Sequence, residues 1–334
     1  MQCARTYLQN LIAKLGVRAA RKAAALSRMH LDWLQRRLMA DLARAAVRPR
    51  WAATALLAAA AICLTACGNA DTGSTASLRD IRSRVVVSLT FDDGTESQYA
   101  LGFGHGLLPL GVHGTFYVAT GNTGVNPGAM SWSQLSYLHQ RGNDVGGHTV
   151  HHIDLASSSN SLARKAAEVC GNYQALARHG LHPVSFSYPY GAYNTAAEHV
   201  AARCGFRTAR QAGGIDDHGP GAGPIYAETM PAHNPYAIRT VYNSTKAAPL
   251  VVANLQRAVT AAARHGGGWV VLVFHEICSV SYDPAGYGYC THSWGSIELD
   301  AFDAFLEWLA HPGQPGGAPA GTIVRTVRQV TGRS

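Results

Sequence analysis

The sequence predicts an α/β barrel, in which helices cover a parallel β-sheet and polar residues follow the strands. Two apolar, β-branched runs, 85–91 and 269–274, are typical of strands that are buried on both faces. The first run is followed by Asp92 and Asp93, and the second by His275. Helical patterns separate the strand candidates, which indicates parallel strands. In such a barrel the functional side chains lie at the carboxyl ends of the strands.

Strand and helix candidates alternate along the body of the chain. Strand patterns occur at 85–91, 115–119, 144–148, 184–188, 205–210, 238–242, 269–275 and 321–327. Helical patterns occur at 131–139, 161–178, 195–203, 247–265 and 297–309. Ser131 is a suitable N-cap for the first helix, and Gly180 is a suitable C-terminal stop for the second. We expect a loop and a short helix at 95–110, long loops at 212–236, and no second domain.

The first 67 residues have the character of an export signal. They hold eleven Lys or Arg residues against two Asp residues, which leaves 17 basic and 18 acidic residues in the other 267. The near-neutral body offers no electrostatic argument for nucleic-acid binding. Arg48 and Arg50 precede an apolar run at 51–66, which is short for a membrane span and typical of a signal peptide.

The apolar run ends in Leu-Thr-Ala-Cys at 64–67, which resembles the lipobox of bacterial lipoproteins. The resemblance implies cleavage before Cys67 and a lipid on its sulfur, and hence a membrane-anchored protein on the cell surface or in the periplasm. Without lipidation the protein would be secreted. Translation is expected to start at Met39 rather than Met1. The predicted parts are a basic extension with signal peptide at 1–67, a flexible linker at 68–83 and a catalytic domain at 84–334.

Four cysteines follow the export signal: Cys170, Cys204, Cys278 and Cys290. An even number of cysteines in an exported protein predicts two disulfides. Cys278 and Cys290 flank a loop rich in Tyr and Gly and are candidate partners by proximity, which leaves Cys170 for Cys204. The sequence leaves other pairings open. None of the spacings is typical of a structural zinc site.

Candidate metal ligands lie at two of the predicted strand ends. Asp92 and Asp93 are adjacent carboxylates, which suits a metal ligand beside a general base, although Asp-Asp-Gly also occurs in ordinary β-turns. His148 and His152 are four residues apart, so on one helical turn they would face the same way and could bind one ion. An accidental pair is the alternative, because the chain holds 16 histidines.

His275 is either a hydrogen-bonded core residue or an acid–base group. Two imidazoles and one carboxylate leave a divalent ion with open positions, as in catalytic sites. The second carboxylate, Asp92, would then accept a proton from water, while His275 would donate one to the leaving group. A backbone N–H near Tyr190 would stabilise the oxyanion. Together these groups predict metal-assisted hydrolysis of an amide or an ester.

Four segments resemble the ordered motifs of the polysaccharide deacetylases, the NodB-homology domain of carbohydrate esterase family 4. They are Thr-Phe-Asp-Asp-Gly at 90–94, His-Thr-Val-His-His at 148–152, Ser-Tyr-Pro-Tyr-Gly at 187–191 and Val-Phe-His at 273–275. The resemblance spans about residues 84–310 and implies a distorted (β/α) barrel of about seven parallel strands. It also implies a base at Asp92, a general acid at His275, an oxyanion group at Tyr190, and a metal triad of Asp93, His148 and His152.

Three features depart from the family pattern. Ser187 stands where the family often has an arginine that steadies the catalytic aspartate. Val273 replaces a leucine of the acetyl pocket. No clear fourth motif, with its Asp-Trp pair, occurs between 205 and 236. Candidates for the missing support of the aspartate are Arg207, Arg210, Asp216 and Asp217.

The sequence and the resemblance together predict a metal-dependent hydrolase of carbon–nitrogen bonds other than peptide bonds. We expect it to remove acetyl groups from a polysaccharide containing N-acetylglucosamine, chitin-like or peptidoglycan, with Zn²⁺, Co²⁺ or Ni²⁺ as cofactor. We expect a monomer that reaches the membrane through Cys67 and binds no nucleic acid. The alternatives are a non-catalytic carbohydrate-binding protein and an O-acetyl xylan esterase. Aromatic residues at 282–294 could stack on sugars or pack within their own loop.

Overall fold

The computed structural model describes residues 84–215, 224–242, 244, 247 and 249–332. The predictions for the signal peptide, Cys67, the linker and the start at Met39 concern residues outside these ranges. Within the described ranges, no helix is both long and apolar enough to span a bilayer.

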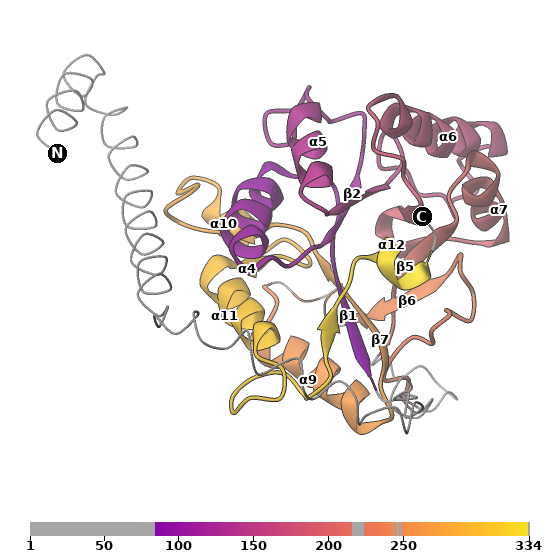
Figure 1. Cartoon of the computed structure of the whole chain (residues 1–334). Coiled ribbons are helices and arrows are strands. Elements are labelled where there is room, and N and C mark those ends of the chain that lie inside the picture. The colour runs from indigo at the N-terminus through magenta and orange to yellow at the C-terminus, as the bar shows by residue number, and fades with distance from the viewer. Residues whose placement is uncertain (1–83, 216–223, 243, 245–246, 248, 333–334) are drawn as a thin grey trace, which may run out of the picture. The chain divides into compact units, whose positions relative to one another are not determined.

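Eight parallel strands form one curled sheet, so the predicted distorted (β/α) barrel is confirmed (Figure 1). The strands are β1 (Val85–Phe91), β2 (Thr115–Val118), β3 (Asp144–Gly147), β4 (Ser185–Ser187), β5 (Thr208–Ile215), β6 (Ile238–Val241), β7 (Gly268–Phe274) and β10 (Ile323–Val324). The order β10-β1-β2-β3-β4-β5-β6 is completed by β7, which pairs with β1. All seven residues of β1 are buried, as its apolar, β-branched sequence predicts.

The central strand β1 has β7 along one edge and two strands along the other. All of β7 pairs in register with it, from Val85 opposite Gly268 to Phe91 opposite Phe274. On the opposite edge, β10 pairs with the amino-terminal half of β1 and β2 with its carboxyl end. Two strands therefore share one edge of β1, and its carboxyl end is paired on both sides, with β2 and with β7.

No ladder joins β6 to β7 within the part of the chain that the structure describes, and single residues bridge the gap. The Ser244 hydroxyl donates to the Val241 carbonyl at 2.7 Å and accepts from the Val273 N–H at 3.2 Å. At the other end, the backbones of Glu228 and Trp269 exchange two hydrogen bonds of 2.8 Å. These contacts bring β7 beside β6, so the sheet curls into a barrel rather than staying open.

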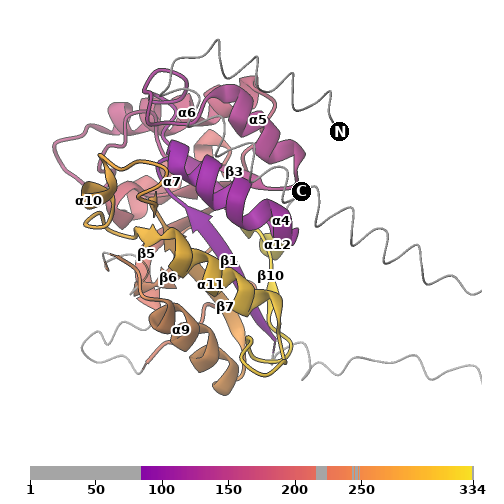
Figure 2. The ribbon, with the colours of Figure 1, turned by 90° about the vertical axis from the view of Figure 1, so that its left-hand side faces the viewer.

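Helices cover the outside of the sheet (Figures 1 and 2). They are α5 (Trp132–Gln140), α6 (Leu162–Arg178), α7 (Thr195–Cys204), α9 (Val252–Arg264), α11 (Leu299–Ala310) and α12 (Val327–Thr331). The predicted N-cap is confirmed, because Ser131 and Gln134 form a reciprocal capping box at the start of α5. The aromatic core lies under α11, where Phe91 stacks on Phe116 at 4.6 Å and on Phe274 at 5.4 Å.

Three predicted elements differ from the structure. Residues predicted as a loop and short helix form a ten-residue π-helix, η1 (Gln98–Leu107), followed by the short α4 (Leu108–Leu110). A β-carbon at Gly106 would lie 2.8 Å from the Phe302 ring, so the glycine lets η1 approach α11 closely. The predicted loops at 212–236 begin later, because β5 continues to Ile215. The last strand is only two residues long, and α12 replaces its predicted end.

Candidate active site

The acidic pair occupies a left-handed turn at the end of β1. Adjacent side chains of an extended strand point in opposite directions. Asp93 has φ 77° and Gly94 has φ 74°, so the chain turns sharply after Asp92 and both carboxylates line the same cleft. Aspartate tolerates this conformation better than most residues. At Gly94 a β-carbon would lie 3.1 Å from a Val118 methyl group, which favours glycine there.

The two histidines reach the cleft from a loop, so the predicted helical turn at 148–152 is wrong. Thr149 and His152 have φ 62° and 55°, and the segment contains no helix. These left-handed residues fold the chain back after β3, which places the rings of His148 and His152 4.8 Å apart. The expected proximity of the two rings is therefore observed, although its cause is backbone reversal rather than helical periodicity.

Two buried side chains of α6 hold this loop in place. Glu168 accepts from the backbone N–H groups of Val150 at 3.1 Å and His151 at 2.8 Å. The Asn172 amide donates to the Thr149 carbonyl at 2.6 Å and to the Val118 carbonyl at 2.9 Å. The strained loop is thus fixed by hydrogen bonds from a helix whose own position is set by the sheet.

Asp93, His148 and His152 form a candidate metal site. Their ligand atoms all lie within 4.8 Å of one another. Asp93 Oδ1 is 3.5 Å from His148 Nε2 and 3.3 Å from His152 Nε2. His148 Nδ1 lies 2.7 Å from the Ser187 carbonyl, to which it donates, so the lone pair of Nε2 faces the other donors. A carboxylate with two imidazoles is a donor set suited to Zn²⁺ and related ions.

Asp92 lies next to this triad and contacts Arg210. The Arg210 guanidinium donates to Asp92 Oδ1, and the Ser187 hydroxyl donates to Oδ2 at 3.3 Å. Ser187 and Arg210 are register partners on β4 and β5, so their side chains point to the same face of the sheet. The guanidinium also lies over the Tyr117 ring at 4.7 Å.

The pKa values of both aspartates are lowered. Burial raises the pKa of Asp92, but the charges of Arg210, His148 and His275 together outweigh it and hold the pKa below its ordinary value. Burial also raises the pKa of Asp93. The hydrogen bond from His148 and the charges of His148, His275 and His152 outweigh burial, so the pKa lies well below its ordinary value. Both side chains are therefore carboxylates at neutral pH.

Arg210 gives Asp92 the support that an arginine at position 187, where this chain has Ser187, would otherwise provide. Of the four residues considered for support of Asp92, Arg210 makes the contact, whereas Asp216 and Asp217 lie outside the described residues. The Arg210 side chain is 1% exposed. A small residue at 187 leaves room for a long one at the paired position, and only the strand register reveals this relation.

Gln98, in the first turn of η1, is a site residue that the sequence analysis missed. Its buried amide donates to the backbone carbonyl of Asp92 and, at 2.8 Å, to that of His275. The Asp92 N–H in turn donates to the Phe274 carbonyl at 2.9 Å. Gln98 thereby ties the ends of β1 and β7 together. One buried glutamine carries no sequence signal for this role.

Tyr190 lies in the short 3-10 turn η2 (Pro189–Gly191) and has φ 62°. The residue is 65% exposed, and its ring lies 4.6 Å from the His152 ring in an edge-on arrangement. At Gly191 a β-carbon would lie 2.5 Å from that of Ala212, so the turn fits closely against β5. The turn therefore brings Tyr190 to the candidate metal site.

All six predicted site residues meet in one cleft of about 500 Å³ at the carboxyl ends of the strands. The cleft is lined by Asp92, Asp93, His148, His152, Tyr190, Gly191, Ala212, Val273, His275, Glu276, Tyr289, His292, Ser293 and Trp294. Val273, which replaces the usual leucine of the last motif, lines this cleft. The two predicted disulfides are present, Cys170 with Cys204 and Cys278 with Cys290.

The fold and the cleft define a (β/α) barrel with a candidate metal-dependent hydrolytic site. Residues 80–209 match the family model of polysaccharide deacetylase, which is less than half of the chain. The matched segment includes the acidic pair, both histidines and the turn at Tyr190. No curated protein matches the chain in sequence.

Several solved structures resemble the chain at low identity. The Streptococcus pyogenes deacetylase PplD in complex with acetate is 24% identical, with a TM-score of 0.38, over 47% of this chain and 65% of that one. IcaB from Ammonifex degensii is 26% identical, with a TM-score of 0.33, over 37% and 58%. The Xyl-CE4 domain of a xylanase from the hindgut metagenome of Trinervitermes trinervoides is 16% identical, with a TM-score of 0.45, over 75% and 91%. The chain thus spans less than two thirds of the first two proteins.

Proposed function

We propose that the protein is a metal-dependent deacetylase that removes acetyl groups from an N-acetylated polysaccharide. The observation that carries the proposal is the convergence of Asp93, His148 and His152 within 4.8 Å, beside Asp92 in an open cleft. The family match supports it, because the matched residues include all four of these side chains. A non-catalytic sugar-binding protein would need neither the arginine-held carboxylate of Asp92 nor His275 beside it.

The candidate triad has the ligands of a catalytic rather than a structural metal site. Three protein donors leave coordination positions open for water and substrate. A divalent ion bound there would supply a Lewis acid and a more acidic water molecule. We expect Zn²⁺, with Co²⁺ or Ni²⁺ as alternatives.

Asp92 is the proposed general base. Its lowered pKa keeps it ionised at neutral pH, so it can accept the proton of the attacking water. Arg210 and Ser187 each hold one of its oxygens, which fixes the plane of the carboxylate. Arg210 is thus a positioning residue, because it acts through Asp92 rather than on the substrate.

His275 is the proposed general acid. It lies close enough to both aspartates for its charge to lower their pKa values, and it lines the same cleft. A proton from its ring would go to the nitrogen of the leaving sugar as the bond to the acetyl carbon breaks. The backbone N–H of Tyr190 is the proposed donor to the oxyanion.

Acetate release from a panel of substrates tests the proposal. Purified protein is stripped with a chelator, reloaded with Zn²⁺, Co²⁺ or Ni²⁺, and given N-acetylated chito-oligosaccharides, peptidoglycan or acetylated xylan. We expect acetate from an N-acetylated substrate, loss on chelation and recovery with metal. Asp93→Asn should lower the rate about 100-fold or more. Asp300→Asn, on the exposed side of α11, is the matched control and should leave the rate unchanged.

Two results would replace the proposal. Acetate release from acetylated xylan alone would make the protein an O-acetyl esterase. Tight binding of a carbohydrate without acetate release from any substrate, with metal bound, would make it a non-catalytic binding protein.

Export of the protein and its anchoring through Cys67 remain part of the proposal. The two disulfides support an oxidising compartment, where such bonds form and persist. Mass spectrometry of the mature amino terminus should show lipid on Cys67. A free amino terminus downstream of Cys67, or the Met1 terminus in the mature protein, would contradict anchoring.

A further inference from the structure

Gln98 lies between the residues proposed as base and acid. Its side chain is fully buried, and its amide donates to the backbone carbonyl of Asp92 and, at 2.8 Å, to that of His275. Both partners are acceptors, so the amide nitrogen with its two hydrogens faces them. One amide group therefore joins the main chain of the proposed base to that of the proposed acid.

The helix that carries Gln98 lies against the ends of both strands. Gln98 is the first residue of the π-helix η1, and π-helical turns are frequent at functional sites. A β-carbon at Gly102 would lie 3.6 Å from the Phe91 ring and 3.5 Å from Ile277. Phe91 ends β1, and Ile277 begins β8 (Ile277–Cys278), which follows β7. The position of η1 is thus set by the two strand ends that its first side chain joins.

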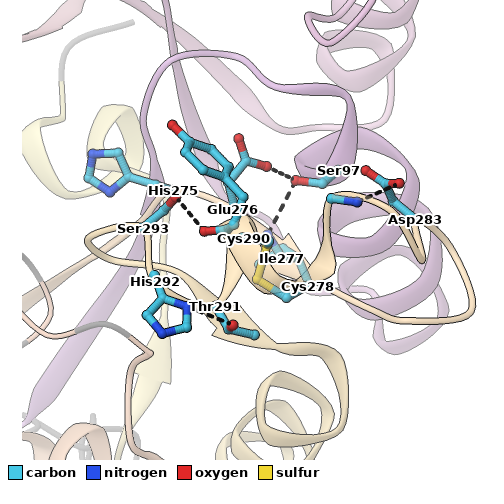
Figure 3. The surroundings of a disulfide bond; sticks show 12 residues. Ser97, His275, Glu276, Ile277, Cys278, Asp283, Cys290, Thr291, His292 and Ser293 are labelled. Atoms are coloured by element: carbon cyan, nitrogen blue, oxygen red, sulfur yellow. Dashed lines mark hydrogen bonds between the residues drawn. A yellow bond between two sulfur atoms is a disulfide. The ribbon is translucent and has the colours of Figure 1, made fainter.

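The residues that follow His275 are also held from the start of η1 (Figure 3). Ser97 Oγ accepts from the Ile277 N–H at 3.2 Å and donates to the Glu276 carboxylate. The Thr95 hydroxyl donates to the same carboxylate at 3.1 Å. Three successive residues after β7 are therefore bonded to the segment that connects β1 to η1.

A disulfide fastens the chain just beyond this point. Cys278 is bonded to Cys290 of the one-turn α10 (Tyr287–Cys290), as Figure 3 shows. β8 also pairs in parallel with β9 (Ile297–Glu298). The exit of β7 is therefore held on two sides, by η1 and by the loop that the disulfide closes.

The proposed acid depends on its main chain more than the proposed base does. The Asp92 carboxylate has two side-chain partners, Arg210 and Ser187. The buried Nδ1 of His275, in contrast, has no hydrogen-bond partner among the described residues. The main chain of His275 is held instead, because its N–H donates to a backbone carbonyl at 2.8 Å and its own carbonyl accepts from Gln98. Loss of the Gln98 amide should therefore displace the acid more than the base.

We propose that Gln98 is a positioning residue that sets the place of His275 relative to Asp92. The inference rests on the function proposed for the cleft, and it adds to that mechanism a residue outside the four motifs. In the proposed reaction, water adds to the acetyl carbon and loses a proton to Asp92. The carbon–nitrogen bond then breaks as the nitrogen takes a proton from His275, which yields acetate and a free amine.

The leaving group of the substrate separates the two parts of this mechanism. An amine must be protonated in order to leave, so hydrolysis of an N-acetyl group requires the acid. Nitrophenolate is a weak base and leaves without a proton, so hydrolysis of 4-nitrophenyl acetate requires only the base. A displaced acid should therefore slow the amide and spare the ester.

Substitution of Gln98 in the metal-loaded protein tests the proposal. Gln98→Met keeps the length of the side chain and removes both donors, so kcat for the tetramer of N-acetylglucosamine should fall about 10- to 100-fold. KM, the affinity for Zn²⁺ and kcat for 4-nitrophenyl acetate should not change. Gln98→Asn keeps an amide and should show a smaller loss with the same dependence on the leaving group, so it serves as the test if Gln98→Met does not fold. Gln329→Met is the control, because it makes the same change in the capping box of α12 and should leave both rates unchanged.

A double mutant shows whether Gln98 acts through His275. His275→Ala should lower the rate of amide hydrolysis about 100-fold or more, and the further change Gln98→Met should alter it by less than about twofold. Losses that multiply in the double mutant would overturn the inference, as would equal losses for amide and ester in Gln98→Met. A native, metal-loaded protein that releases no acetate from any N-acetylated substrate would refute the proposed function itself.

Discussion

The two ends of the barrel use the same chemical pair for different purposes. At the carboxyl end, Asp92 pairs with Arg210 and faces the cleft. At the amino end, Asp144, the first residue of β3, is 3.0 Å from Arg328 of α12. Both carboxylates are buried. Burial raises the pKa of each, yet the pKa of Asp92 is lowered overall and that of Asp144 stays raised.

The difference follows from the charges that surround each carboxylate. The charges of Arg210, His148 and His275 all lower the pKa of Asp92, and the first of these side chains is fully buried. Asp144 depends mainly on Arg328, whose side chain is 25% exposed and partly screened by solvent. Burial alone therefore does not decide whether a carboxylate is held ionised, because the charged and hydrogen-bonding groups that face it also set its pKa.

The backbone shows the same contrast between the two ends. Among the described residues, five that are not glycine have left-handed φ values. Four of them, Asp93, Thr149, His152 and Tyr190, lie in the turns that form the cleft, and His182 is the exception. Left-handed residues other than glycine are strained, typically by about 1–3 kcal/mol. Strain is thus concentrated where side chains of separate strands must converge.

Replacing Asp92 and Asp144 in turn should give the largest difference in kcat between the two ends of the barrel. Asp92→Asn removes the proposed base, and we expect kcat for acetate release to fall about 10²- to 10⁴-fold. Asp144→Asn is the same substitution at the other end of the barrel, and it should leave kcat within twofold. Equal losses of kcat in the two variants would show that the effect is structural. Full activity of Asp92→Asn would show that Asp92 is not the base.

Replacing the two arginines should separate positioning from stability. Arg210→Met leaves Asp92 buried and unpaired, so we expect a loss of about 3–5 kcal/mol in the free energy of unfolding. The misplaced carboxylate should also lower kcat by about 100-fold. Arg210→Lys, which keeps the charge, should recover part of both. The measurements are urea unfolding and initial rates on the metal-loaded protein, and unchanged kcat in Arg210→Met would contradict a positioning role.

Arg328→Met should affect stability alone. The Arg328 guanidinium donates to Asp144 at 3.0 Å and to the His182 carbonyl at 2.6 Å, which fixes α12 to the amino end of the sheet. Loss of these charge-assisted bonds should lower the free energy of unfolding by about 1.5–3 kcal/mol. Acetate release per folded molecule should not change. A large fall in kcat would show that the two ends of the barrel are coupled.

Glu228→Gln should give the smallest effect, and one that depends on pH. Burial raises the pKa of Glu228, but hydrogen bonds from Arg239 and from backbone N–H groups outweigh it, so the pKa is lowered overall. The ionised pair therefore stabilises the folded protein above the ordinary glutamate pKa, and this contribution is lost as pH falls through the lowered value. Native protein should exceed the variant in unfolding free energy at pH 7, and the difference should shrink in acid. A difference independent of pH would contradict this account.

Much of the fold and of the site followed from local patterns. Apolar β-branched runs predicted β1 and β7, and polar residues after them predicted which side chains would meet at the strand ends. Proximity suggested the Cys278–Cys290 disulfide, which left Cys170 for Cys204, and the structure contains both bonds. These features are readable because burial, turn formation and strand exit each restrict residue types over a few neighbouring positions.

The tertiary structure decided the features that depend on contacts between distant residues. The sequence offered four candidates to support Asp92, and the register of β4 and β5 selected Arg210. Gln98 had no signal because its partners are two backbone carbonyls on different strands. The helical turn predicted at His148 was wrong because side chains of α6, far along the chain, stabilise a reversed loop. Residue types thus determined which chemistry was available, and strand order and register determined which groups could act together.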